Sequence, residues 1–216
     1  MAKEIFIVPT AHLSKKSIRL VRDTINKTNP DAVAVELCKN RYHALLSNHK
    51  APPWEFIKRG HFFMLILSIL QNYLSKKIGL IPGAEMLEAV KIAKKKKIPI
   101  ALIDQNFFIT MSKLKKVPLS EKFRLLFLSA KGFKKMSIDD MTKEENLVEI
   151  LEIMKAKLPK IYKVLVHDRN HFMARQLKGI PFNRVVAVVG AGHAKGIKDI
   201  IDKEVKNANR RNKKTL

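Results

Sequence analysis

Runs of apolar residues divide the first part of the chain into alternating strands and helices. Residues 4–8 read Glu-Ile-Phe-Ile-Val and end at a proline, which predicts a short strand. Residues 32–35 read Ala-Val-Ala-Val, the continuous apolar run typical of a parallel strand that is buried on both faces. Between these runs, apolar residues recur at helical spacing over residues 14–27. The chain is therefore expected to begin with a strand, a helix and a second strand.

The same alternation continues along the rest of the chain. Residues 84–97 predict a helix with a lysine cluster at its C-terminal end, and residues 98–103 predict a third strand. Residues 185–189 are a fourth apolar run, and the segment 105–180 before it has helical spacing. This order predicts an α/β fold with a mostly parallel central sheet flanked by helices, in which residues 105–180 form a helical insertion or cap.

The pattern predicts one domain followed by a short tail. Residues 190–193 read Gly-Ala-Gly-His and predict a tight turn, after which a last helix ends near residue 207. Residues 1–207 are therefore interpreted as a single α/β domain and residues 208–216 as a basic disordered tail. Residues 54–78 form a more apolar helical stretch, which packs either in the core or across a partner surface, so a homodimer stays open.

Composition narrows the class of protein. With 216 residues, of which 46% are hydrophobic and 29% charged, the chain is long enough to bury a core without disulfides. The single cysteine, Cys38, excludes a disulfide scaffold and a four-cysteine zinc site. No apolar run reaches the roughly 18 residues of a membrane span, and the N-terminus has no signal-peptide pattern. We therefore expect a cytoplasmic protein.

The charge is strongly positive, at +24 from 43 Lys and Arg against 19 Asp and Glu. Such a surplus favours polyanions, either nucleic acid or the anionic face of a membrane. The lysines are spread along the chain, however, and no aromatic residues interleave with a basic stripe as in many nucleic-acid binders. We interpret the charge as a Lys-rich solvated surface, with weak polyanion contact through residues 94–97 and 210–214 as the alternative.

Polar residues suited to chemistry follow each predicted strand. His12 follows the first strand, Glu36 the second, Asp104 the third and His193 the fourth. Because ligands bind outside the carboxyl ends of parallel strands, these four side chains are expected at one edge of the sheet. Imidazole and carboxylate groups suit a divalent transition metal, which lowers the pKa of a bound water. The structural alternative is that each residue caps a helix, pairs with a lysine or is a satisfied polar group.

A predicted helix over residues 161–177 adds two charged candidates. At about 100° per residue, Asp168 and Arg169 fall within its apolar arc, whereas His167 and His171 fall outside it. Buried charges are costly unless paired, so Asp168 and Arg169 either form a structural ion pair or face a polar cavity. The two histidines are four residues apart, and we interpret them as a solvated surface pair rather than a metal chelate.

Six short segments together resemble the TraB/PrgY family. The resemblance covers residues 5–205 in order, and the family belongs with the Tiki proteins and, more distantly, with erythromycin-esterase-like proteins. The segments are Pro-Thr-Ala-His12-Leu-Ser, Val-Ala-Val-Glu36-Leu-Cys-Lys-Asn-Arg41-Tyr, Pro82-Gly-Ala-Glu85-Met86, Ile-Ala-Leu-Ile-Asp104-Gln, Asp168-Arg169-Asn170-His-Phe-Met173-Ala174 and Val-Val-Gly190-Ala-Gly192-His193-Ala-Lys-Gly196-Ile.

This resemblance implies a metal-dependent hydrolase. The family is marked by two Gly-x-x-His motifs, a glutamate and a polar Arg/Asn helix motif. Tiki members are described as manganese or cobalt proteases, and PrgY members block a peptide pheromone. Carried over by position, the resemblance implies His12 and His193 as the motif histidines, Glu36 as a metal ligand or general base, and Arg169 and Asn170 as pocket groups. Taken together with the placement at the strand ends, it leads us to expect metal ligands at His12, Glu36 and His193, and catalytic groups at Glu36, Arg169 and Asn170. Groups that bind substrate or orient ligands are expected at Arg41, Asp104 and Asp168.

One position departs from the family pattern. Pro9 takes the place of the glycine in the first motif, which stiffens the backbone before His12. The leading hypothesis is a peptidase-type hydrolase acting on a peptide or a small amide or ester, in which manganese, cobalt or zinc activates water. The alternatives are a non-catalytic module that sequesters a peptide in the same cleft, and a basic polyanion-binding protein.

Overall fold

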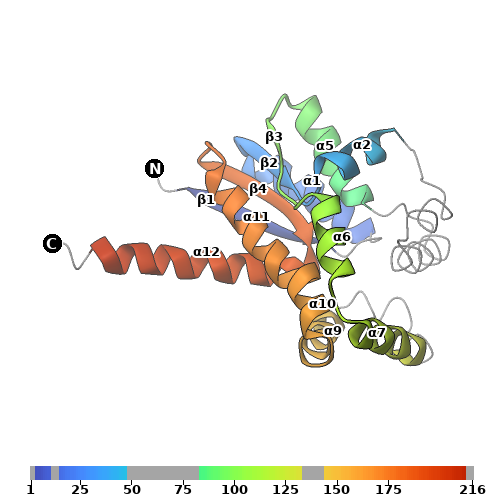
Figure 1. Cartoon of the computed structure of the whole chain (residues 1–216). Helices are drawn as coiled ribbons and strands as arrows, with labels where there is room; N and C mark the ends of the chain where they lie inside the picture. Colours follow the sequence, from blue (N-terminus) through green and yellow to red (C-terminus); the bar gives the residue numbers. More distant parts are fainter. Residues whose placement is uncertain (1–2, 11–14, 48–82, 133–143, 213–216) are drawn as a thin grey trace.

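The protein has an α/β fold built on an all-parallel sheet of four strands (Figure 1). The computed structural model describes residues 3–10, 15–47, 83–132 and 144–212. The predicted mostly parallel sheet flanked by helices is confirmed. The strands are β1 (Glu4–Thr10), β2 (Ala32–Val35), β3 (Ile100–Leu102) and β4 (Arg184–Gly190), and their order in the sheet is β1-β4-β2-β3.

The last strand lies between the first two. One row of paired residues crosses the whole sheet, from Val8 in β1 through Val188 in β4 and Val35 in β2 to Leu102 in β3. Because all strands are parallel, their carboxyl ends lie just beyond this row at a single edge. That edge is where the candidate residues after the strands were expected.

Helices cover both faces of the sheet because alternate strand residues point to opposite sides. On one face, Val33 and Val35 pack against α1 (Lys15–Thr28) and α5 (Ala84–Lys95). On the other face, Ala32 and Ala34 pack in a second core with α11 (Asp168–Gly179) and α12 (Ala191–Asn212). All four residues of β2 are buried, as the continuous apolar run predicted.

In its described residues, the segment 105–180 consists of helices joined by short connections. The helices before α11 pack together around a small core of their own, which includes Met111, Leu114 and Ile161. α11 instead packs on the sheet. The other helices of the described residues are α2 (Lys39–Leu46), α6 (Phe107–Lys115), α7 (Leu119–Gly132), α9 (Glu144–Lys157), α10 (Pro159–Tyr162) and the π-helical turn η1 (Lys163–His167).

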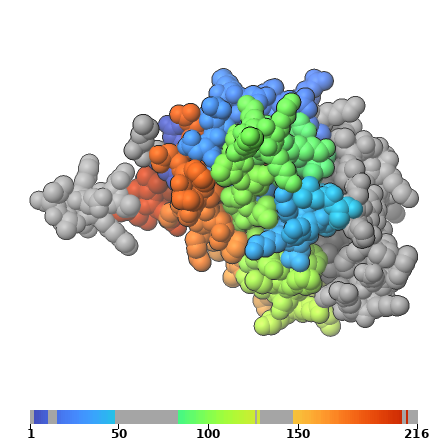
Figure 2. Space-filling model, turned by 90° about the horizontal axis from the view of Figure 1, so that it is seen from above, coloured from blue at the N-terminus to red at the C-terminus, as the bar shows by residue number. Residues whose placement is uncertain are grey.

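The last helix differs from the prediction at both ends. β4 leads directly into α12 at Ala191, so residues 190–193 form the strand end and the first helical turn rather than a tight turn. α12 continues to Asn212, beyond the predicted end near residue 207, because Ala208, Arg210 and Arg211 favour helix and no Gly or Pro interrupts residues 207–212. Figure 1 shows α12 extending to one side of the sheet, and Figure 2 shows its red part emerging on the same side of the body.

Two other expectations concern helices. In the described part of the chain, no helix combines the length and apolarity needed to cross a membrane. The apolar stretch over residues 54–78 lies outside the described residues, so its packing and the homodimer remain predictions.

Candidate functional site

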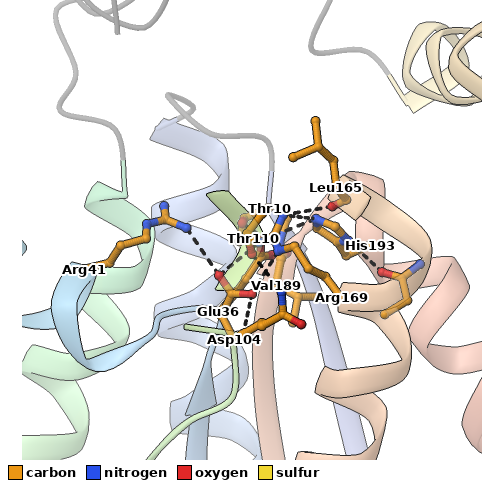
Figure 3. Close-up of polar contacts among 12 residues, drawn as sticks. Thr10, Glu36, Arg41, Asp104, Thr110, Leu165, Arg169, Val189 and His193 are labelled. Atoms are coloured by element: carbon orange, nitrogen blue, oxygen red, sulfur yellow. Dashed lines mark hydrogen bonds and ion pairs between the residues drawn. The ribbon is translucent and has the colours of Figure 1, made fainter. Parts of the chain in front are cut away.

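The guanidinium of Arg169 is the centre of a polar cluster at the carboxyl edge of the sheet (Figure 3). Its Nε and Nη2 donate to Oδ1 and Oδ2 of Asp104 at 2.9 and 3.0 Å, a bidentate pair. Nη2 also donates to Glu36 Oε1 at 2.6 Å. Nη1 donates to the carbonyl oxygen of Leu165 at 3.1 Å and lies 3.0 Å from His193 Nε2. These contacts use all five N–H groups of the guanidinium.

Two carboxylates keep this buried guanidinium charged. The side chain of Arg169 is 14% exposed, and that of Glu36 is 4% exposed. Burial alone would lower the pKa of Arg169, but the negative charges of Glu36 and Asp104 outweigh burial and raise that pKa above its ordinary value. The side chains of Arg169, Glu36 and Asp104 therefore form a buried ionic network.

Glu36 joins the ends of two neighbouring strands. It follows β2 directly, and its Oε2 accepts a hydrogen bond of 2.7 Å from the backbone N–H of Gly190, the last residue of β4. The hydroxyl of Thr10, at the end of β1, donates to the carbonyl of Val189 in β4 at 3.1 Å. Hydrogen bonds thus hold the ends of β1, β4 and β2 together around the site.

The imidazole of His193 is oriented from both sides. Arg169 can only donate, so Nη1 donates to Nε2 and the neutral ring carries its proton on Nδ1. Nδ1 lies 2.6 Å from Oδ1 of Asn170, which accepts that proton. This tautomer is assigned from the hydrogen-bond network. The ring is buried and stands in the first turn of α12. Asn170 and Arg169, neighbours on α11, therefore set both the tautomer and the direction of this histidine.

A glycine that the sequence analysis left without a role makes this contact possible. A Cβ at Gly196 would lie only 2.2 Å from Nδ2 of Asn170. Gly196 is three residues after His193, on the same face of α12. A glycine within a predicted helix often has a packing reason, which is the signal that points to it in the sequence. Its missing side chain lets Asn170 reach the histidine ring.

The π-helical turn η1 directs the two charged residues that follow it, Asp168 and Arg169, toward different partners. The backbone N–H of Asp168 donates to the carbonyl of Lys163, five residues earlier, which changes the phase from that of a straight helix. Asp168 pairs with Lys113 and Lys163 at 2.8 and 2.6 Å, whereas Arg169 reaches the sheet edge. An ion pair between Asp168 and Arg169 is therefore the wrong interpretation, because each pairs with other residues.

The ion pairs of Asp168 also change its acidity. Burial would raise the pKa of this carboxyl, but hydrogen bonds from Lys113 and Lys163 outweigh burial and lower the pKa well below its ordinary value. The carboxylate of Asp168 thus belongs to a second ionic group, which it forms with Lys113 and Lys163.

The structure joins five of the candidate residues by hydrogen bonds and a sixth, Arg41, by an ion pair. Arg41 stands at the rim of the cluster, with Nη1 3.6 Å from Asp104 Oδ2. His167 and His171 are exposed, with ring centroids 4.6 Å apart, which confirms the surface pair. His12 lies outside the described residues. The five that contact one another are Glu36, Asp104, Arg169, Asn170 and His193.

Two donors of the cluster have the spacing of metal ligands. His193 Nε2 and Glu36 Oε1 lie 3.5 Å apart, close to the roughly 3.3 Å between two ligands of a tetrahedral site with bonds of about 2.0 to 2.1 Å. The single lone pair of Nε2 already accepts from Arg169, so a metal has to displace that hydrogen bond. Among the described residues, no group of three or more His, Cys, Asp and Glu side chains is arranged to hold a metal. The donor chemistry fits a divalent transition metal, and the third predicted ligand is His12.

Comparisons with known proteins agree with the resemblance of the sequence motifs. The model of the TraB/PrgY/gumN family matches residues 2–207. An uncharacterized protein of Methanocaldococcus jannaschii is 35% identical over 219 residues, which cover 95% of this chain and 55% of the relative. TraB domain-containing proteins of Mus musculus and Homo sapiens are each 28% identical over 235 residues, covering 89% of this chain and 61% of theirs.

The chain thus spans between 55% and 61% of the length of these relatives. The family model covers nearly all of the chain, and the archaeal relative matches it over the same extent. The predicted resemblance to TraB/PrgY domains is confirmed, and the chain belongs to the TraB/PrgY/gumN family.

Proposed function

We propose that this protein is a metal-dependent hydrolase of the peptidase type, acting on a peptide or a small amide or ester. The observation that carries this proposal is the pair of donors, His193 Nε2 and Glu36 Oε1, which lie 3.5 Å apart at the carboxyl edge of a parallel sheet. His12, Glu36 and His193 would hold manganese, cobalt or zinc. When bound there, the metal would supply a water of lowered pKa and polarise a carbonyl oxygen.

The other residues of the cluster prepare these ligands. Asn170 accepts from Nδ1 of His193, which leaves Nε2 unprotonated as the ligand atom. Asp104 holds the guanidinium of Arg169 by two hydrogen bonds, so the guanidinium stays in place when Nη1 is released from Nε2. The freed Nη1–H would then be available to bind an anionic group of the substrate or a developing oxyanion.

The charge around the site favours substrates that carry carboxylates. Arg41 is at the rim and only partly buried, and the whole chain carries a formal charge of +24. A positive surface raises the local concentration of anionic ligands and speeds their association. A peptide with acidic side chains or a free carboxyl terminus therefore suits the site better than a basic peptide. A cytoplasmic location, expected from the sequence, is part of this proposal.

Metal content and peptide cleavage test the proposal together. The wild type, purified without chelators, should hold about one equivalent of a transition metal by mass spectrometry, and so should the control His171→Ala, which changes an exposed histidine. His193→Ala and Glu36→Gln should lose the metal and the cleavage of a peptide library while circular dichroism shows a folded protein. A wild type that refuses added manganese, cobalt and zinc would contradict the proposal.

One observation favours a second function, a non-catalytic module that binds a peptide. All five N–H groups of Arg169 are used within the protein, so the cluster is complete as a structural ionic network. In that case a peptide should bind equally well with and without chelator, and no cleavage should occur. Calorimetric titration with peptides that survive the cleavage assay distinguishes the two functions.

A further inference from the structure

Helix α7 is fastened to the protein through polar residues. The carboxylate of Glu121 is buried, and its Oε2 accepts from the backbone N–H groups of Lys160 and Ile161 at 3.0 and 3.1 Å, capping the start of α10. Arg124 donates to the carbonyl oxygen of Lys157, the last residue of α9, at 3.0 Å. These contacts give hydrogen-bond partners to backbone groups at the start of α10 and the end of α9, and they fix which side of α7 faces inward.

The opposite side of the same helix is apolar and exposed. Leu125 and Leu128 lie on the inward side with Glu121 and pack against the small core of the helical segment. Leu119 and Phe123 are four residues apart, which places both about half a turn away from the inward side. Each of the two side chains is 67% exposed. We name these two residues the outer stripe.

The arrangement of α7 inverts the usual one, with a carboxylate inside and phenylalanine outside. The helix cannot turn its outer stripe inward without withdrawing the carboxylate of Glu121 from the start of α10. The backbone N–H groups of Lys160 and Ile161 would then lose their acceptor, which is costly. Figure 1 shows α7, α9 and α10 grouped together at one end of the molecule, away from the sheet. An apolar stripe that is held outward on an anchored helix marks a surface for interaction.

The charges beside the outer stripe indicate the chemistry of the partner. Residues 113–131 contain six basic residues and a single acidic one, Glu121, which is buried. At about 100° per residue, Lys122 and Arg124 lie on either side of the outer stripe. Apolar residues flanked by basic ones are typical of helices that lie in the interface of an anionic bilayer, where the charged groups contact the lipid headgroups.

We propose that α7 docks this protein on an anionic lipid surface, with the outer stripe inserted at the level of the headgroups. A second copy of the chain is the less suitable occupant, because it carries the same charge of +24 and the two copies repel each other. This docking is independent of the proposed hydrolase, because none of the described contacts of the Arg169 cluster comes from α7. It adds a surface that places the site near a membrane.

Vesicle co-sedimentation tests the docking with the full chain. The wild type should bind vesicles of phosphatidylserine and phosphatidylcholine, bind pure phosphatidylcholine at least tenfold more weakly, and lose binding as salt rises. The double variant Leu119→Gln/Phe123→Gln should bind the anionic vesicles roughly tenfold more weakly than the wild type. Leu20→Gln on α1, where the leucine is 46% exposed, is the matched control and should bind within about twofold of the wild type.

Thermal unfolding and light scattering of the same variants decide how the vesicle result is interpreted. Thermal unfolding should be nearly the same in all variants, because the changed residues are exposed. Equal vesicle binding by the double variant and the wild type would overturn the proposal, because the binding would then come from the general positive charge. Light scattering that shows a wild-type dimer, dissociated in the double variant, would overturn it in favour of a second copy.

Discussion

Replacing Arg169 by methionine should reveal how much the buried ionic network contributes to stability. The substitution keeps a long side chain but removes five N–H donors and one positive charge. Glu36 keeps its hydrogen bond from the Gly190 N–H, and Asp104 keeps one from the Gln105 N–H. Both carboxylates nevertheless lose their buried cation, and breaking a buried ion pair on one side costs about 3 to 5 kcal/mol.

The assay is urea unfolding at pH 7, followed by circular dichroism. We expect the free energy of unfolding of Arg169→Met to be lower than that of the wild type by about 3 to 5 kcal/mol. The matched control is Arg22→Met, because the side chain of Arg22 is 54% exposed and pairs with Glu88 on the surface. That exposed pair should contribute at most about 1 kcal/mol.

A triple variant separates the loss of charge pairing from the loss of packing. Adding Glu36→Gln and Asp104→Asn to Arg169→Met removes the two uncompensated charges, so part of the lost stability should return. If Arg169→Met costs no more than Arg22→Met, the burial of the network is not what stabilises this edge and the reasoning is refuted. If the triple variant is less stable than Arg169→Met, the uncompensated charges are not the source of the cost.

The remaining predictions concern single contacts. Gly196→Ala should lower the free energy of unfolding by about 1 to 3 kcal/mol, because the added Cβ meets the side chain of Asn170. Gly179→Ala is the control and should leave this free energy nearly unchanged, because a Cβ there meets nothing within 4 Å. Urea unfolding measures both variants. Asn170→Ala should release the ring of His193 and populate the other tautomer, seen in ¹⁵N spectra of the imidazole, and an unchanged spectrum would contradict the assignment. The two lysine partners of Asp168 lower the pKa of its carboxyl in the folded protein. The ionised carboxylate therefore contributes to the free energy of unfolding above about pH 4, and this contribution is lost as the pH falls further. The Tm difference between Asp168→Asn and the wild type should accordingly shrink below that pH.

The sheet and the edge that carries the candidate site could be predicted from local sequence patterns. A run such as Ala-Val-Ala-Val at residues 32–35 is apolar on both faces of a strand, so it predicts a buried parallel strand without knowledge of its neighbours. Residues just beyond the ends of such strands, including Glu36 and Asp104, then fall at the same edge whatever the order of the strands. The place of a strand along the chain and the period of a helix depend on neighbouring residues, which is why local patterns predict them, whereas the exact ends of β1, β3 and α12 differ from the prediction.

The partners of each charged group were decided only by the tertiary structure. The wheel placed Asp168 and Arg169 on one face, but the π-helical turn and the packing of α11 on the sheet gave them different partners. Helical spacing predicted α7, yet which apolar side faces inward depends on Glu121 reaching the start of α10. Gly196 has a role only because α11 crosses α12 at that residue. Such choices rest on contacts between segments far apart in the chain, whose distances no local pattern specifies.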